Sequence, residues 1–210
     1  MKANKVLSSR VIIKKTIRNK LNSLIIIFFG FMLTGCFGSP TPVPEDRFYT
    51  VELSKADIYP TKYKRITIKR VHAYGLYKER AMLYSSADLP LQIKRYHYHH
   101  WVMPPTQIIE NGLKDYLIQS RISKEVRIQV IRQVEDISIS AELMAFERVL
   151  QKGEQSVHLE LEFEIVRPDG RQQTLKFTKD KKTKNDTLHA AAIAYGEVLS
   201  DIFKKLLLEL

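Results

Sequence analysis

The stretch VHLELEFEIV, residues 157–166, alternates between apolar and polar side chains as far as Ile165. A period of two residues is typical of a β-strand with one face in the core and the other in water. The stretch therefore predicts a half-buried strand of an antiparallel sheet. Its apolar face consists of Val157, Leu159, Leu161, Phe163 and Ile165, and its polar face of His158, Glu160, Glu162 and Glu164.

The residues after this strand predict a hairpin. RPDGR, residues 167–171, is a turn signal whose glycine suits the left-handed backbone conformation. The apolar faces of the two strands match only if the connection has an odd number of residues. That condition places Phe163 opposite Leu175 and Glu162 opposite Lys176.

The run before this strand, residues 137–146, has the same period but loses it near Met144–Glu147, which predicts a bulge. Residues 151–153 form the turn between the two strands. Closer to the N-terminus, the alternation within residues 65–71 places Ile66, Ile68 and Arg70 on one face. The strand-like runs of this part of the chain are residues 47–53, 65–71, 80–85 and 91–102.

Two segments have helical spacing. In residues 103–120, Pro104 or Pro105 suits the first turn, and Gly112 lies on the apolar face, which predicts a close contact there. A long amphipathic helix covers about residues 186–209, with Asn185 or Asp186 as its cap. The apolar face of the first helix is Ile108, Ile109, Leu113, Tyr116 and Leu117. That of the second is Leu188, Ala191, Ala192, Tyr195, Val198, Leu199, Ile202, Phe203 and Leu206.

The order of these elements is strands, helix, strands, helix. It predicts an α+β fold: a single domain with a mostly antiparallel sheet covered by two main helices, the last one long and C-terminal.

The N-terminus has the pattern of a secretory signal. Residues 1–20 contain seven Lys or Arg and no acid, and residues 24–33 are apolar throughout. Ten helical residues reach about 15 Å, against a bilayer core of about 30 Å, so the run is too short for a permanent span. The net charge of the chain is +11, and the seven basic residues account for most of it, so nucleic acid is not an expected partner.

The tetrapeptide LTGC, residues 33–36, resembles the bacterial lipobox, in which the cysteine sulfur receives a diacylglycerol. Cys36 is the only cysteine of the chain, and we predict that it is lipidated and becomes the first mature residue. The alternative is a plain membrane anchor with an incidental cysteine. The predicted organisation is a signal peptide at 1–35, a proline-rich linker at 36–46 and a folded domain at 47–210, held to the membrane by N-terminal acyl chains.

A cluster of histidines and tyrosines precedes Trp101. It predicts a surface for a partner or a lipid headgroup, because His and Tyr suit contacts that are partly apolar and partly hydrated. Two alternatives remain open. One is a metal pair of His97 and His99 on a shared strand face, although no third ligand lies nearby. The other is a structural role, with Trp101 and one tyrosine face in the core. The cluster consists of Tyr96, His97, Tyr98, His99 and His100.

The sequence lacks the P-loop, C-x-x-C, H-E-x-x-H and G-x-S-x-G motifs. We therefore expect no enzyme activity, no catalytic residue, no cofactor and no metal. A basic segment, KDKKTK at 179–184, is interpreted as a solvated loop, with contact to anionic lipid or an acidic partner as the alternative.

The order of features resembles the ABC-type transport auxiliary lipoproteins, the group that includes PqiC (YmbA). The resemblance covers residues 36–210. Where the family usually has an acidic residue soon after the tryptophan, this chain has Val102-Met103-Pro104. The resemblance is carried by the lipobox and then by FYTVEL, ITIKRV, YGLYKERAMLY and HHWVMPPTQIIENGLKDYLIQS, followed by long hairpin strands and a C-terminal helix.

The resemblance implies a periplasm-facing lipoprotein, usually on the outer membrane. Such a protein works with an MCE-domain protein and an ABC or Pqi-type inner-membrane unit in moving lipids between membranes. Phe37 agrees with an outer-membrane address, since the aspartate that commonly retains lipoproteins in the inner membrane is absent. Ring-like homo-oligomers suit a docking role, and the sequence specifies no subunit number.

Two other functions share the anchor and the size. One is an outer-membrane assembly or pilotin-like structural lipoprotein, which the co-purifying partner would separate from a transport accessory. The other is an envelope hydrolase, which would require activity that depends on His97 or His99.

Overall fold

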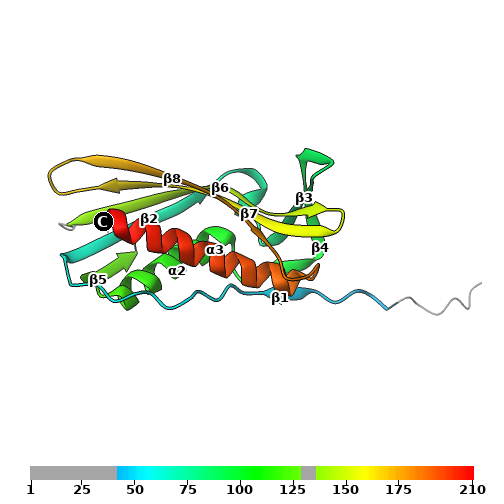
Figure 1. The fold of residues 1–210 in the computed structure, drawn as a ribbon, viewed down its shortest axis with the longest axis horizontal. Coiled ribbons are helices and arrows are strands. Elements are labelled where there is room, and N and C mark those ends of the chain that lie inside the picture. The colour runs from blue at the N-terminus through cyan, green and yellow to red at the C-terminus, as the bar shows by residue number, and fades with distance from the viewer. Residues whose placement is uncertain (1–41, 129–135) are drawn as a thin grey trace, which may run out of the picture. The chain divides into compact units, whose positions relative to one another are not determined.

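The computed structural model describes residues 42–128 and 136–210 (Figure 1). The chain divides into two units, Met1–Pro44 and Glu45–Leu210, and the fold below is that of the second. The signal peptide, the lipobox and Cys36 lie outside the described residues, so their assignment stays a prediction. Within the described residues, no helix combines the length and the apolar character that crossing a bilayer requires.

The described elements build a single sheet with two α-helices and one 3-10 helix. In chain order they are β1 (Arg47–Tyr49), β2 (Tyr63–Ala73), η1 (Gly75–Lys78), β3 (Ala81–Ser86), β4 (Leu89–Trp101), α2 (Pro105–Ser120), β5 (Ser123–Ile128), β6 (Ile137–Gln151), β7 (Glu154–Val166), β8 (Gln172–Lys182) and α3 (Leu188–Glu209).

Strand β6 is the centre of the sheet, and the sheet forks along its length. One edge of β6 pairs with β7, which pairs with β8. The other edge pairs first with β2 and then, past Met144, with β3. The β2 arm ends in β5 and the β3 arm in β4 and β1. The α+β prediction is confirmed, with one addition: parallel ladders join β6 to β2 and β3, β2 to β5, and β1 to β4.

The β7–β8 hairpin has the predicted register. Phe163 lies opposite Leu175, and Glu162 lies opposite Lys176. Gly170 has a φ of 81°, the left-handed conformation that the turn requires. The predicted bulge is present as well, since the register of β6 against β7 shifts between Leu143 and Ala145.

The prediction for β2 was wrong from Arg70 onward. Ile66 and Ile68 are buried, but Arg70 is exposed, and Val71 is buried in its place. The cause is an irregularity of the β2–β6 ladder between Ile68 and Val71. An extra residue there moves every later side chain to the opposite face.

Both α-helices cover the apolar side of the sheet. Helix α3 packs against β7 and β8, and α2 packs against β2 and β5 (Figure 1). The cross-strand row Ile68, Ile139 and Ile165 forms part of the buried floor. All the residues predicted for the apolar faces of the two helices are buried.

The predicted cap of α3 was wrong. Thr187 is the N-cap, and its Oγ1 accepts a hydrogen bond from the backbone N–H of Ala190 at 3.1 Å. Asn185 lies two residues earlier and supports the cap, because its Oδ1 accepts from both the N–H and the hydroxyl of Thr187. The helix thus starts two residues later than the sequence predicted.

Candidate functional site

The histidine-aromatic cluster lies on the C-terminal half of β4. The register of β4 against β3 shifts between the pair Ala81–His100 and the pair Leu83–Arg95, so β4 carries extra residues over this segment. A bulge re-aims side chains and breaks the alternation of faces. This explains why His97 is exposed while His99 and His100 are half-buried.

Strand β1 holds two of the histidines. His99 Nδ1 lies 3.1 Å from the Tyr49 hydroxyl, and the two rings are 5.8 Å apart. The His100 ring lies 5.7 Å from that of Phe48. His100 Nε2 is 3.3 Å from Oδ1 of Asp46, the residue just before β1.

Burial and charge act together on His99. Burial is the largest influence that lowers its pKa, and the nearby Arg47 and His100 lower it further. The neutral imidazole is therefore favoured in the folded protein. An unprotonated Nδ1 can accept a hydrogen bond from the Tyr49 hydroxyl, whereas a protonated one cannot.

The two histidines of the suggested metal pair have different neighbours. The His97 ring lies 6.4 Å from that of Tyr98, whereas His99 contacts Tyr49 and has Tyr96 edge-on at 5.7 Å. Among the described residues, no group of three or more His, Cys, Asp or Glu is arranged to hold a metal ion. His97 is thus a surface side chain, whereas His99 contacts β1 through Tyr49.

Trp101 confirms the structural part of the cluster. It is 1% exposed, with its ring 5.4 Å from that of Phe146 and 5.3 Å from that of Tyr195. Tyr96 packs partly against this core, and its hydroxyl accepts a hydrogen bond at 3.2 Å from the guanidinium of the buried Arg148. The C-terminal end of β4 is thus anchored in the core by Trp101. The side chains of residues 97–100, just before it, form the histidine-aromatic surface.

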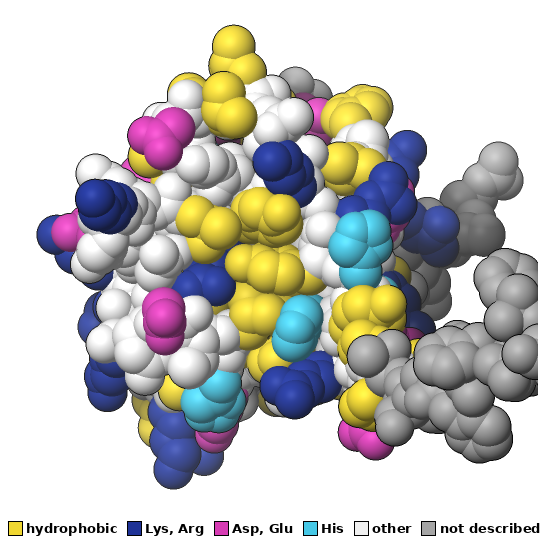
Figure 2. All heavy atoms as spheres, turned by 90° about the vertical axis from the view of Figure 1, so that its right-hand side faces the viewer, with side chains coloured by type: hydrophobic (Ala, Val, Ile, Leu, Met, Phe, Trp, Pro, Cys, Tyr) yellow, Lys and Arg dark blue, Asp and Glu magenta, His cyan; other side chains and the backbone are white. Residues whose placement is uncertain are grey.

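This surface adjoins the point where the chain enters the folded unit. Figure 2 shows the end of the unit that carries β1, β3 and β4, where hydrophobic side chains gather with histidines and basic side chains around them. A hollow of about 490 Å³ lies beside it, between residues 48–54 and α3. His189, Ile193 and Glu197 line its helical side.

Sequence reasoning missed the residues that β1 and α3 bring to the cluster. The sequence predicts a strand over residues 47–53, but the strand ends at Tyr49. Parallel pairing of β1 with β4, which places Phe48 beside His100, has no local sequence signal. The aromatic pair Phe48-Tyr49 was the available hint.

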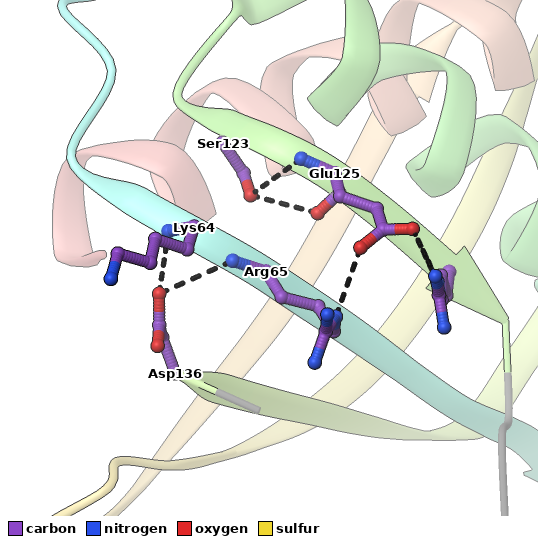
Figure 3. Close-up of polar contacts among 6 residues, drawn as sticks. Lys64, Arg65, Ser123, Glu125 and Asp136 are labelled. Carbon is purple, nitrogen blue, oxygen red and sulfur yellow. Dashed lines mark hydrogen bonds and ion pairs between the residues drawn. The ribbon is translucent and has the colours of Figure 1, made fainter. Parts of the chain in front are cut away.

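A second polar cluster lies at the other arm of the sheet and has a structural role (Figure 3). Glu125 on β5 forms ion pairs with Arg65 on β2 and with Arg127. The hydrogen bonds from these two arginines lower the pKa of Glu125, and the bond from Arg65 has the larger effect. Asp136 accepts hydrogen bonds from the backbone N–H groups of Lys64 and Arg65. The carboxylate of Glu125, held between two guanidinium groups, links β2 to β5, and that of Asp136 holds the start of β2.

The interpretation of residues 179–184 as a loop was wrong for the first four. Lys179–Lys182 belong to β8, an edge strand of the sheet. Lys181 pairs with Glu197 at 2.9 Å and Lys182 with Glu154 at 2.8 Å. Lysines on an edge strand discourage pairing with a further chain, which gives this basic run a structural reason.

A comparison with models of protein families gave no match, and neither did a search of curated proteins. Solved structures with a similar fold were found. Protein XCC0632 from Xanthomonas campestris, described as family-model DUF330, has a TM-score of 0.65 and 16% identity, covering 77% of this chain and 91% of that one. A second, an uncharacterized protein, has a TM-score of 0.58 and 14% identity, covering 79% and 96%.

The matches also include a minor lipoprotein from Acinetobacter baumannii, with a TM-score of 0.34, 14% identity and coverage of 69% and 89%. A TM-score of 0.34 does not establish a shared fold. At the identities of XCC0632 and the uncharacterized protein, the similarity shows a shared fold and nothing finer.

Proposed function

We propose that this chain is a lipoprotein anchored through Cys36 to the outer membrane, where it faces the periplasm. It acts there as a non-enzymatic accessory subunit of an MCE and ABC-type system that moves lipids between membranes. The sequence resemblance to the ABC-type transport auxiliary lipoproteins supports this role, because it runs from the lipobox to the C-terminal helix.

The observation that carries the proposal is the position of the histidine-aromatic surface. It sits on β4 beside β1, where the linker from Cys36 enters the folded unit. A docking surface next to the tether stays close to the membrane, where an assembly that spans the envelope would arrive. Tyr98 belongs to this surface, is 43% exposed, and has its ring 6.4 Å from that of His97. Partly exposed aromatic side chains such as this one are enriched in protein interfaces.

Photo-crosslinking from Tyr98 tests the proposal. A crosslinking amino acid replaces Tyr98 in the full chain expressed in its own envelope, and Ile118 on α2, which is 49% exposed, takes the same substitution as the matched control. We expect an MCE-domain protein to be crosslinked from position 98 and not from position 118.

Three other results would contradict the proposal. A β-barrel protein captured from position 98 would favour the pilotin-like alternative. Phospholipid captured in its place would make the surface a headgroup contact. Equal capture of an MCE-domain protein from both positions would remove the argument for this surface.

A further inference from the structure

The first residues of β4, directly after the turn from β3, form an exposed apolar tip. Leu91 is 99% exposed and Leu89 is 56% exposed, with Pro90 between them. Ile93, two residues further along β4, lines an apolar hollow of about 310 Å³ together with Leu76, Leu143 and Met144. Isolated exposed leucines are ordinary, but two of them on either side of a proline, with Ile93 and its apolar hollow close by in the chain, indicate a contact surface.

The chain from the predicted anchor enters the folded unit at β1, which pairs with the strand that carries the tip. Strand β1 runs parallel to β4, with Arg47 opposite His99. The tip lies at the other, N-terminal end of the same strand β4. Figure 1 shows the β3–β4 hairpin at the same side of the unit as the start of β1.

The linker is long enough to bring the predicted lipid anchor level with the tip. Eight residues separate His99 from Leu91 along β4, which is at most about 26 Å for an extended strand. Residues 37–46 span up to about 31 Å when extended, as their prolines favour. Acyl chains on Cys36 can thus enter a bilayer whose surface meets Leu91.

Basic side chains stand directly behind the tip. Lys94 and Arg95 are both exposed, and Arg95 is held by an ion pair with Glu79 at 3.0 Å. An apolar end followed by Lys and Arg matches the order of acyl chains and phosphates in a membrane. Asp88 in the turn opposes the phosphates, so the leucines must provide the main attraction.

We propose that the tip inserts Leu89 and Leu91 into the phospholipid membrane that holds the chain's own anchor, with Lys94 at the headgroup phosphates. The inference rests on the proposed anchoring at Cys36. A tether raises the effective concentration of the second contact, so a small apolar tip suffices to orient the folded unit on the surface. The histidine-aromatic surface then faces the space just above the headgroups.

The experiment uses the full mature lipoprotein in vesicles of phosphatidylethanolamine and phosphatidylglycerol. Leu91→Cys places a thiol at the tip for an environment-sensitive dye, and acylation of Cys36 consumes the only other thiol. Leu208→Cys is the matched control, because Leu208 is a 67% exposed leucine near the C-terminal end of α3, at the opposite side of the unit in Figure 1. We expect dye at 91 to shift to the blue and to lose most of its emission to a lipid-borne quencher, and dye at 208 to do neither.

The outcomes separate this inference from the function proposed above. Water-like emission at both positions, on a chain whose Cys36 is acylated, overturns the tip contact and leaves the anchor intact. An unacylated Cys36 overturns both. Protection of position 91 in native envelopes but not in vesicles shows that a protein covers the tip and also contradicts the inference. Lys94→Glu should weaken the quenching in these vesicles and leave it unchanged in uncharged phosphatidylcholine vesicles.

Discussion

The carbonyl oxygen of Glu52 occupies the space that a Cβ atom on Gly196 would need. The segment after β1 crosses α3 at this glycine. Two hydrogen bonds continue the contact: Ser54 N–H donates to the Ser200 hydroxyl at 2.9 Å, and that hydroxyl donates to the Gly196 carbonyl at 2.7 Å. The segment that leads in from the tether is thus fixed on the C-terminal helix.

Gly196→Ala should therefore lower the free energy of unfolding by about 1–3 kcal/mol or more, because backbone must move to make room. Gly112→Ala is the control on α2. A Cβ there meets the flexible Leu53 side chain at 3.0 Å, and the gain of about 1 kcal/mol in helix propensity offsets part of the cost. Urea unfolding followed by circular dichroism measures both. Equal losses in the two variants would contradict the crossing.

Trp101→Ala should cost about 3–5 kcal/mol, because it empties the space between Phe146 and Tyr195. The neighbouring Val102→Ala should change the stability by less than about 0.5 kcal/mol, since Val102 is exposed. The midpoint of chemical unfolding compares the two. A loss of stability for Trp101→Ala as small as that for Val102→Ala would mean that the core does not hold the C-terminal end of β4.

The lowered pKa of His99 predicts a loss of stability in acid. A histidine whose folded pKa lies below its unfolded value of about 6.5 binds more protons when unfolded. The stability that neutral His99 contributes is thus complete above the unfolded pKa. It is lost as the pH falls from the unfolded pKa toward the folded pKa. His99→Gln should be less sensitive between pH 7.5 and about pH 5 than the wild type, as melting temperatures across this range would report. Parallel pH profiles for the two proteins would contradict this.

Tyr77→Phe should destabilise the fold by about 1–3 kcal/mol, because it removes the donor to a buried carboxylate. The Tyr77 hydroxyl donates to Glu147 Oε2 at 2.7 Å, and burial together with that carboxylate raises the pKa of the tyrosine. Tyr74→Phe is the matched control, since Tyr74 is an exposed tyrosine next to η1. Thermal unfolding of the two variants decides, and an equal change in both would show that the hydrogen bond contributes nothing.

Local patterns predicted those parts of the fold that local chemistry decides. The register of Phe163 against Leu175 follows from one turn and one alternation, and both lie within a single hairpin. The parallel ladder that pairs Ile66 with Ile137 joins residues far apart in the sequence, so no turn signal marks it. Val51 and Leu53 extended the apparent first strand because they are apolar at every second position. In the structure they pack on the helices at Gly196 and Gly112.

The residue types from Tyr96 to His100 suggest a partner or headgroup surface, which stays a prediction. Their geometry does not follow from the sequence, because the bulge that separates His97 from His99 depends on how β4 matches β3. The contacts that Asp46 and Tyr49 make with His100 and His99 depend on the parallel pairing of β1. Neither interaction follows from spacing along the chain.

Whether Cys36 carries the membrane anchor is decided by mass spectrometry of the N-terminal peptide of the mature protein. We predict a peptide that begins at Cys36 and carries a diacylglycerol on sulfur together with an acyl chain on its amine, and we predict that Cys36→Ala accumulates as the unprocessed chain. A mature N-terminus at any other residue, or a Cys36 without fatty acid, would contradict the anchor and the function built on it.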